Sequence, residues 1–255
     1  MDSAQEALMD RLVASPASVP KMDLDTALAR FSAIGFRKFE VWTNWANSAF
    51  DIEQDPAFYL AKGREYGLTF PVVHLETLRP NKPELFERAV KATRFAKAIG
   101  AGIVSFKARP RALYIEQTSS FLDAVAALGI HVVVQNHANS AIETLDDVRE
   151  VHDRIADERL KALLEVGHFH TYGVGWKEAC DYLGDRIVHV HVWDRKGAQA
   201  VPFGTGEIDL PALFRHLTAM GYTGDFLVEM EIDDQELAMQ YFGEALVYLR
   251  EHCAG

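Results

Sequence analysis

Short apolar runs alternate with longer amphipathic segments along the whole chain. The short runs have the length of buried strands; they are Leu12–Ala14, Lys38–Trp42, Phe70–His74, Ile103–Phe106, Ile130–Gln135, Ala162–Val166, Arg186–Val192 and Phe226–Glu231. The longer segments carry apolar residues at helical spacing, as in 82–99, where Phe86 and Val90 fall on one face. This regular alternation predicts repeated βα units around a parallel sheet.

Helix start and stop residues fall where this interpretation needs them. Pro56 follows Asp55 at one predicted start, and Gly67 follows the end of the same helix. The predicted helices cover 24–34, 55–66, 82–99, 115–128, 144–155, one segment between Val166 and Arg186, 210–220 and 235–250. Eight βα units in about 250 residues close most simply into a barrel. We therefore expect a single (β/α)8 TIM barrel that forms one domain over residues 1–255.

An open, doubly wound sheet is the alternative architecture. Such a sheet normally carries a glycine-rich turn after its first strand, where it binds its ligand. The chain has SPASVP at this place instead. The barrel is therefore the favoured fold.

Composition limits the classes of function. No apolar run approaches the ~20 residues of a membrane helix, and the opening MDSAQEALMDRL has too many charges for a secretory signal. Cys180 and Cys253 stand far apart, which gives no disulfide framework, so we expect a cytoplasmic protein without a membrane partner. The formal net charge of −11 argues against sequence-independent binding to nucleic acid, because that mode needs lysine and arginine.

Acidic and imidazole side chains stand at the ends of several predicted strands. Side chains alternate along a strand, and barrel enzymes place their chemistry at the carboxyl ends of the strands. This alternation directs a set of polar side chains to the inside of the barrel mouth: Glu40, His74, Gln135, Glu165, His191 and Glu229. Converging carboxylates are costly to bury unless a positive charge compensates them, and a divalent cation would do so.

Two carboxylates, an imidazole and an amide oxygen suit a hard or borderline ion. We expect one divalent metal ion, Mn²⁺ foremost, with Mg²⁺, Co²⁺, Zn²⁺ or Fe²⁺ as alternatives.

Four segments in the second half of the chain resemble a known family in combination. LEVGHFHTYG is similar to its LDxGH motif, VHVHVWD to HxHxxD, FGTGEIDLPALFRHLTAMGYTG to GxGxIDxxxxxxxLxxxGYxG, and FLVEME to its closing VxxE. GFRKFEVW is similar to the family's GFxxVEL. The chain thus resembles the xylose isomerase-like TIM barrels, which include sugar phosphate isomerases and epimerases, inosose dehydratases and endonuclease IV-type enzymes.

The resemblance implies a ligand set for one metal ion. Relatives hold it with Glu, Asp, His and Glu, and the matching residues here are Gln135, Glu165, His191 and Glu229. His168 matches the histidine of LDxGH, which binds substrate or supports the site in relatives. Glutamate therefore replaces aspartate at 165, and glutamine replaces glutamate at 135.

The glutamine at 135 changes the expected chemistry. In the epimerases and ketose isomerases of this family, two carboxylates exchange a proton next to a carbonyl, and an amide cannot act as such a base. We expect a one-base reaction through an enolate, with Glu229, His137 or Lys107 supplying what Gln135 cannot. Dehydration or β-elimination of a keto-sugar or inosose fits this better than a symmetric epimerisation.

Several further residues have two interpretations. Glu40, Trp42, His74 and Lys107 are candidate substrate contacts, although Glu40 could instead pair with Lys107 or Arg109. Lys107, Arg109 and Arg111 could grip a substrate phosphate or carboxylate, or form a solvated loop. His189 lies one layer below His191 and is expected to be a core residue. His137 and His168 are candidate proton carriers beside the base Glu229.

Three functions are compatible with these features. The first is a metal-dependent isomerase, epimerase or lyase that acts on a small sugar or keto-polyol. The second is a DNA repair nuclease of the same fold, which would need a larger metal cluster and a basic groove. The third is a non-catalytic sugar binder that lost its activity when glutamine replaced the glutamate at position 135. The sequence leaves the subunit count open, so a homo-oligomer is compatible with it.

Overall fold

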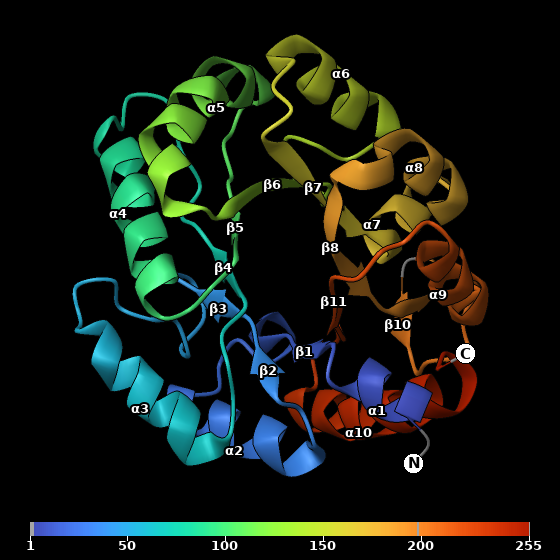
Figure 1. The fold of residues 1–255 in the computed structure, drawn as a ribbon. Coiled ribbons are helices and arrows are strands. Elements are labelled where there is room, and N and C mark those ends of the chain that lie inside the picture. The colour runs from blue at the N-terminus through green and yellow to red at the C-terminus, as the bar shows by residue number, and fades with distance from the viewer. Residues whose placement is uncertain (1–2, 198, 255) are drawn as a thin grey trace.

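The computed structural model describes residues 3–197 and 199–254; the ends of the expected domain and residue 198 lie outside them. Parallel strands form a central barrel, and helices surround it (Figure 1). The barrel strands are β1 Leu12–Ala14, β2 Lys38–Phe39, β3 Val41–Trp42, β4 Val72–His74, β5 Ile103–Ser105, β6 His131–Gln135, β7 Leu160–Glu165, β8 Ile187–Val192 and β11 Asp225–Val228. The predicted TIM barrel is therefore confirmed.

The surrounding helices follow the strands in the predicted order. They are α2 Leu24–Ile34, α3 Pro56–Tyr66, α4 Glu84–Ala98, α5 Arg111–Val125, α6 Leu145–Ile155, α7 Val166–Thr171, α8 Trp176–Leu183, α9 Leu210–Ala219 and α10 Gln235–His252, preceded by α1 Ser3–Met9. Caps set several starts: the Asp55 carboxylate accepts from Ala57 N at 2.9 Å, and Thr144 and Asp147 form a capping box.

The barrel closes through the second predicted strand, which is interrupted at Glu40. Its first half, β2, pairs with β1, and its second half, β3, pairs with β4. All neighbouring barrel strands run parallel, in the order β2-β1-β11-β8-β7-β6-β5-β4-β3. Glu40 N donates to Ala14 O at 3.0 Å across the interruption. The interruption therefore places Glu40 at the seam where the ring closes.

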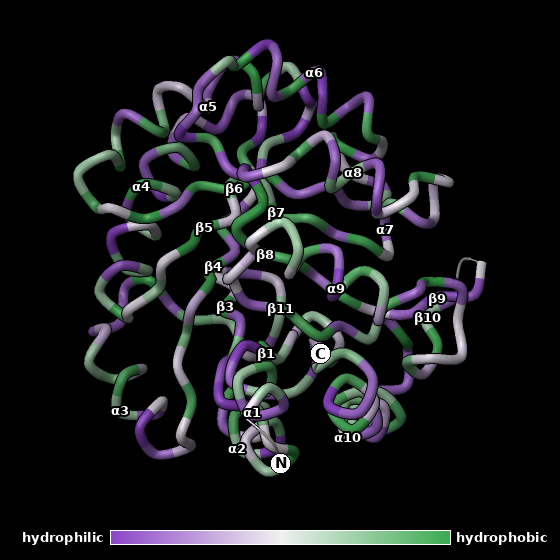
Figure 2. Tube along the Cα trace, turned by 45° about the vertical axis from the view of Figure 1, so that its right-hand side comes forward, coloured by the Kyte–Doolittle hydropathy of each residue, from purple (hydrophilic) through white to green (hydrophobic). Residues whose placement is uncertain are grey.

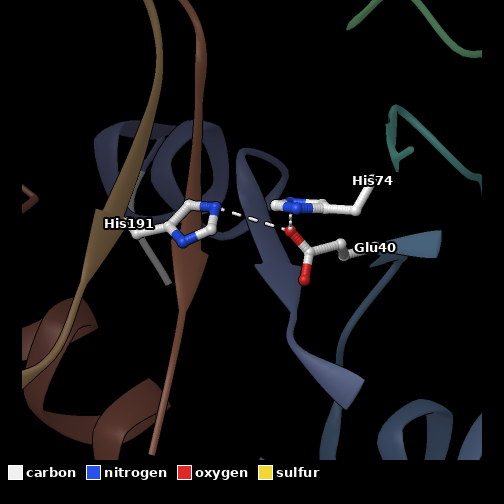
Figure 3. Close-up of side chains that lie close together, drawn as sticks. All are labelled: Glu40, His74 and His191. Carbon is white, nitrogen blue, oxygen red and sulfur yellow. Dashed lines mark ion pairs between the residues drawn. The ribbon is translucent and has the colours of Figure 1, made fainter. Parts of the chain in front are cut away.

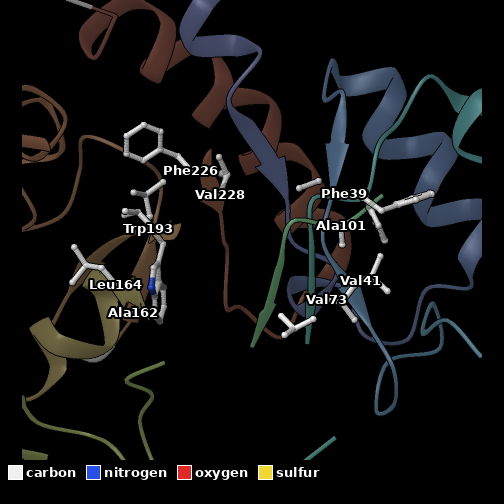
Figure 4. Packing of buried hydrophobic residues seen from close by; sticks show 14 of the residues in the cluster. Phe39, Val41, Val73, Ala101, Ala162, Leu164, Trp193, Phe226 and Val228 are labelled. Carbon is white, nitrogen blue, oxygen red and sulfur yellow. The ribbon is translucent and has the colours of Figure 1, made fainter. Parts of the chain in front are cut away.

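Alternate side chains of each strand pack on opposite sides of the sheet. Ala162, Leu164 and Phe226 belong to the main apolar cluster between strands and helices (Figure 4). Leu163 and Leu227 are equally buried but lie outside that cluster, as expected for residues that face the barrel axis. In Figure 2, apolar segments gather along the central strands and polar segments along the outer helices.

The structure differs from the sequence prediction mainly where the chain departs from the regular alternation of strands and helices. Two helices, α7 and α8, occupy the segment for which one helix was expected. An antiparallel hairpin of β9 Asp194–Lys196 and β10 Gln199–Val201 lies between β8 and α9, where no strand was predicted. The last strand ends at Val228 rather than at Glu231, and α5 begins at Arg111 rather than at 115. The hairpin and the divided helix interrupt the βα repeat, so strand and helix periodicity did not predict them.

Both cysteines are buried and free, which agrees with the absence of a disulfide framework. Among the described residues, no helix combines the length and the apolar character needed to cross a membrane.

Asp194 organises the loop that leads into α9. Its buried carboxylate accepts hydrogen bonds from Gly204 N and Gly206 N, each at 2.9 Å, and from Ile208 N at 3.2 Å. A side chain at position 206 would collide with it, because a Cβ there would lie 2.1 Å from Asp194 Oδ1.

Asp194→Ala should therefore lower the free energy of unfolding by about 3 kcal/mol, because it leaves buried N–H groups without an acceptor. Asp181→Ala is the control: this carboxylate is 58% exposed and pairs with Lys177. We expect the control to lose less than about 1 kcal/mol. Denaturant unfolding measures both values, and equal losses would contradict the role of Asp194.

Candidate functional site

Acidic and imidazole side chains meet at the carboxyl end of the barrel, where strand alternation predicted them. Glu165 is the last residue of β7, His191 lies opposite it on β8, and Glu229 directly follows β11. One donor atom from each lies within 4.8 Å of the other two, and all three side chains are buried. Two carboxylates and one imidazole are therefore available at a single point.

His191 is in contact with both carboxylates. Its Nδ1 lies 2.7 Å from Glu165 Oε2 and 3.5 Å from Glu229 Oε2. Burial alone would lower the pKa of His191, but Glu165 and the other carboxylates outweigh burial and raise that pKa well above its usual value. Burial raises the pKa of Glu165 to about 7. An imidazolium thus compensates the carboxylates here, and a divalent cation could take over that role.

Glu165 is fixed by neighbours on its own loop and on the next strand. Trp193 Nε1 donates to Glu165 Oε1 at 2.5 Å, and Gly167 N donates to the same oxygen at 3.3 Å. The Asn136 side chain forms two hydrogen bonds with the Glu165 backbone, at 2.8 and 3.0 Å. A Cβ at position 167 would lie 2.0 Å from Trp193 Nε1, so glycine is required for the indole to reach Glu165. One carboxylate oxygen is therefore held in place while the other faces His191.

Gln135 ends β6, the neighbour of β7, and is 6% exposed. Its Oε1 is buried and has no hydrogen-bond partner among the described residues. Buried amide oxygens are normally satisfied, so this oxygen is available to a ligand. Gln135 thus lies at the end of the strand that was predicted over Ile130–Gln135, next to the strand that carries Glu165.

A second cluster consists of Glu40, His74 and His191 (Figure 3). It shares His191 with the first cluster. Glu40 Oε1 lies 2.5 Å from His74 Nε2 and 3.4 Å from His191 Nε2. Burial would raise the pKa of Glu40, but His74 and His191 outweigh it and hold that pKa well below its usual value. Burial lowers the pKa of His74 to about 4. Glu40 therefore contacts two imidazoles, and within residues 3–197 and 199–254 it forms no ion pair with Lys107 or Arg109, the partners that one interpretation gave it.

The four candidate substrate contacts lie together but differ in accessibility. Glu40 and His74 have no exposed surface, whereas Trp42 and Lys107 are partly exposed. Trp42 donates from Nε1 to Glu40 Oε2 at 3.0 Å and stacks on His74 with ring centroids 4.4 Å apart. Lys107 Nζ lies 3.9 Å from the centroid of the Trp42 ring. Trp42 and Lys107 therefore cover the buried pair.

His137 and His168 form a third group with Glu231, which follows β11. The two rings are 3.9 Å apart, and Glu231 Oε1 lies 3.7 Å from His168 Nε2 and 4.0 Å from His137 Nε2. Burial lowers the pKa of both imidazoles, that of His168 to about 2, so both rings are neutral near pH 7. His189 is fully buried 5.2 Å from the His191 ring, as expected for a core residue.

The sequence did not indicate Ser15 or the polar role of Trp193. Ser15 Oγ lies 3.4 Å from Glu40 Oε2 and 3.5 Å from Glu229 Oε1, and so connects the two clusters. Continuing the alternation of β1 beyond Ala14 would have placed Ser15 inside the barrel. The indole N–H of Trp193 is the side-chain group that orients Glu165.

The buried donors fit a divalent cation. They are two carboxylates, an imidazole and an unpartnered amide oxygen, a mixture that hard and borderline divalent ions accept. A cavity of about 390 Å³ opens at the opposite, amino end of the barrel, beside His131, Ile187 and Gly224. None of the three donor clusters found among the described residues lies there.

The fold and these donors define a βα barrel with its chemistry at the carboxyl ends of the strands. The chain belongs to the xylose isomerase-like TIM barrel family, whose model matches residues 28–252.

Two curated relatives are inosose dehydratases. The protein from Geobacillus thermodenitrificans is 27% identical over 163 residues, 55% of this chain and 54% of the relative. The protein from Clostridium perfringens is 30% identical over 146 residues, 48% of each chain. The chain thus spans about half the length of the curated relatives it matches. Among solved structures, the IolI protein with a binding zinc atom superposes with a TM-score of 0.80 at 15% identity, over 96% of this chain and 98% of IolI.

Trp193→Phe removes the hydrogen bond to Glu165 while keeping an aromatic ring in the core. Because such partners orient a ligand, we expect the affinity for Mn²⁺ to fall about 10- to 100-fold with little change in the fold. Trp176→Phe is the matched control, since that indole packs near His216, outside the three clusters. Calorimetric titration with Mn²⁺ measures both variants, and an unchanged affinity in Trp193→Phe would contradict this role.

Proposed function

We propose that this protein is a divalent-metal-dependent enzyme that acts on a sugar or keto-sugar, as one domain over residues 1–255. The observation that carries the proposal is the meeting of Glu165, His191 and Glu229 within one buried donor cluster. Membership of the xylose isomerase-like family and the similarity to inosose dehydratases support the substrate class.

Glu165, His191, Glu229 and Gln135 would hold one ion, for which we favour Mn²⁺. When bound, a divalent ion supplies Lewis acidity that polarises a substrate carbonyl. Trp193 and Gly167 hold one oxygen of Glu165, which leaves Oε2 to face His191. Glu40 lies 3.4 Å from Nε2 of His191, the ring nitrogen opposite Glu165, and carboxylates in this position orient metal-binding imidazoles.

Glu229 is the proposed base. It removes the proton from the carbon next to the carbonyl and forms an enolate. The neighbouring Gln135 is neutral and can only bind or hydrogen-bond, so a second carboxylate base is lacking on β6. We therefore favour elimination: the electron pair forms a carbon–carbon double bond, the adjacent carbon–oxygen bond breaks, and the hydroxyl group departs as water after it receives a proton.

His137 and His168 are the proposed carriers or orienters of that proton. Trp42 and Lys107, which are partly exposed, would contact the substrate. Glu40 and His74 have no exposed surface, so we propose that they act through Trp42 and His191.

Proton abstraction can be measured directly in D₂O with a panel of keto-sugars and inososes. We expect deuterium at the carbon next to the carbonyl, and Glu229→Gln should slow this exchange at least about 100-fold because it removes the base. Glu207→Gln is the control, since this exposed carboxylate pairs with His170 away from the clusters. No exchange with any substrate, or undiminished exchange in Glu229→Gln, would refute the proposal.

Gln135→Glu tests why elimination is favoured. The new carboxylate restores a second base, so we expect epimerised or isomerised product to appear at the expense of the unsaturated ketone. Gln240→Glu on the exposed face of α10 provides a matched control. NMR analysis of the products distinguishes the outcomes, and an unchanged product ratio would show that position 135 does not select the reaction.

A further inference from the structure

A cationic cavity of about 210 Å³ lies beside the donor clusters. Its charged lining side chains are Arg79, Lys107 and Arg109, and none of the described residues that line it is an acid. The remaining lining includes polar groups of Thr77, Tyr114, Asn139 and Ser140. The chain as a whole carries a formal net charge of −11, so this concentration of positive charge is local.

The two arginines of the cavity lack carboxylate partners. Within residues 3–197 and 199–254, neither Arg79 nor Arg109 forms an ion pair, and the Arg109 guanidinium makes only a long contact, 3.4 Å, to Asn139 O. Arg111, the first residue of α5, pairs with Asp147 and Glu150. Arg111 is therefore already neutralised, whereas Arg79 and Arg109 remain available to an external anion.

The cavity adjoins the proposed metal site. Gln135 and His137 line it, and the buried Gln135 Oε1 has no hydrogen-bond partner among the described residues. Lys107 also lines it and lies over Trp42, whose indole is bonded to Glu40. A ligand that reaches from this cavity to Gln135 would thus reach the donor cluster as well.

The size of the cavity limits what it can hold. Sites for whole drug-sized ligands measure about 300–1,000 Å³, so a cavity of about 210 Å³ suits one end group with a few carbons. Guanidinium groups bind the paired oxygens of a carboxylate or phosphate with two parallel hydrogen bonds.

We propose that this cavity is a subsite for the anionic end of the substrate, a carboxylate or a phosphate carried by the keto-sugar. Arg79 and Arg109 bind the anionic oxygens, and Lys107, which also lines the cavity and lies over Trp42, contributes the third positive charge. This inference rests on the proposed function for the identity of the substrate, and it adds a charge requirement that the metal site alone does not impose.

Sorbitol, sorbitol 6-phosphate and gluconate test the subsite, because they share a six-carbon polyol chain and differ in the charge of one end. Isothermal titration of the Mn²⁺-loaded protein should show that at least one charged ligand binds at least about tenfold more tightly than sorbitol. Hydrogen bonds between charged groups are stronger than those between neutral groups. The charged ligand that binds more tightly identifies the head group as phosphate or carboxylate.

The double variant Arg79→Gln/Arg109→Gln should reduce this preference to less than about threefold, because both charged hydrogen-bond donors are removed. Arg111→Gln should retain it. Both arginines of the double variant are exposed, so we expect its thermal unfolding to match that of the wild-type protein, which a melting curve measures.

Three results would overturn the subsite: equal affinity for the three ligands, no binding of either charged ligand at millimolar concentration, or an unchanged preference in the double variant. The last result would mean that the anion binds the metal ion instead. If deuterium exchange fails but the arginine-dependent preference persists, the reaction is wrong and the subsite stands. If exchange occurs equally well with neutral substrates and the protein shows no preference for anions, the proposed reaction stands and the subsite is wrong.

Discussion

Several carboxylates are buried around one imidazole, and the stability of the barrel mouth depends on balancing their negative charge. His191 contacts Glu165, Glu229 and Glu40 within 3.5 Å, through both of its ring nitrogens. One imidazolium carries a single positive charge, whereas the three carboxylates can carry three negative charges. Because an uncompensated buried charge is strongly destabilising, this arrangement favours a further positive charge, and a divalent cation provides it with the least change in packing.

The barrel creates this concentration of charge through its register. Parallel strands bring their carboxyl ends to one rim, and the alternation of side chains turns every second residue inward. The break at Glu40 adds a carboxylate at the seam, where β2 and β3 pair with different neighbours. Gly167 then allows the Trp193 indole to reach Glu165, so local backbone choices orient the groups that the register brings together.

Strand periodicity predicted the central part of the site from the sequence. Glu165, His191 and Glu229 lie at or directly after strand ends, where a period of two is reliable, and their donor atoms meet as expected. The sequence did not predict Ser15 as a site residue, because β1 has only three residues and a polar turn follows it. The hairpin β9–β10 and the return of Glu231 toward His137 and His168 lie in loops, whose course depends on tertiary contacts that no periodicity records.

Position 135 links the fold to the chemistry. Within the part of the chain that the structure describes, the buried Gln135 Oε1 at the carboxyl end of β6 has no hydrogen-bond partner, and Arg79 and Arg109 in the adjoining cavity form no ion pair. The charged side chains are therefore mainly carboxylates on one side of Gln135 and arginines on the other. A substrate with a carbonyl and hydroxyl groups at one end and an anion at the other would match this polarity.

Anomalous diffraction from crystals soaked in Mn²⁺ would locate the ion among its ligands. We expect one strong anomalous peak per chain, bonded to Glu165, His191 and Glu229 at about 2.0–2.3 Å, distances typical of such ions with nitrogen and oxygen ligands. A peak elsewhere, or none at a concentration that saturates binding in solution, would contradict this expectation.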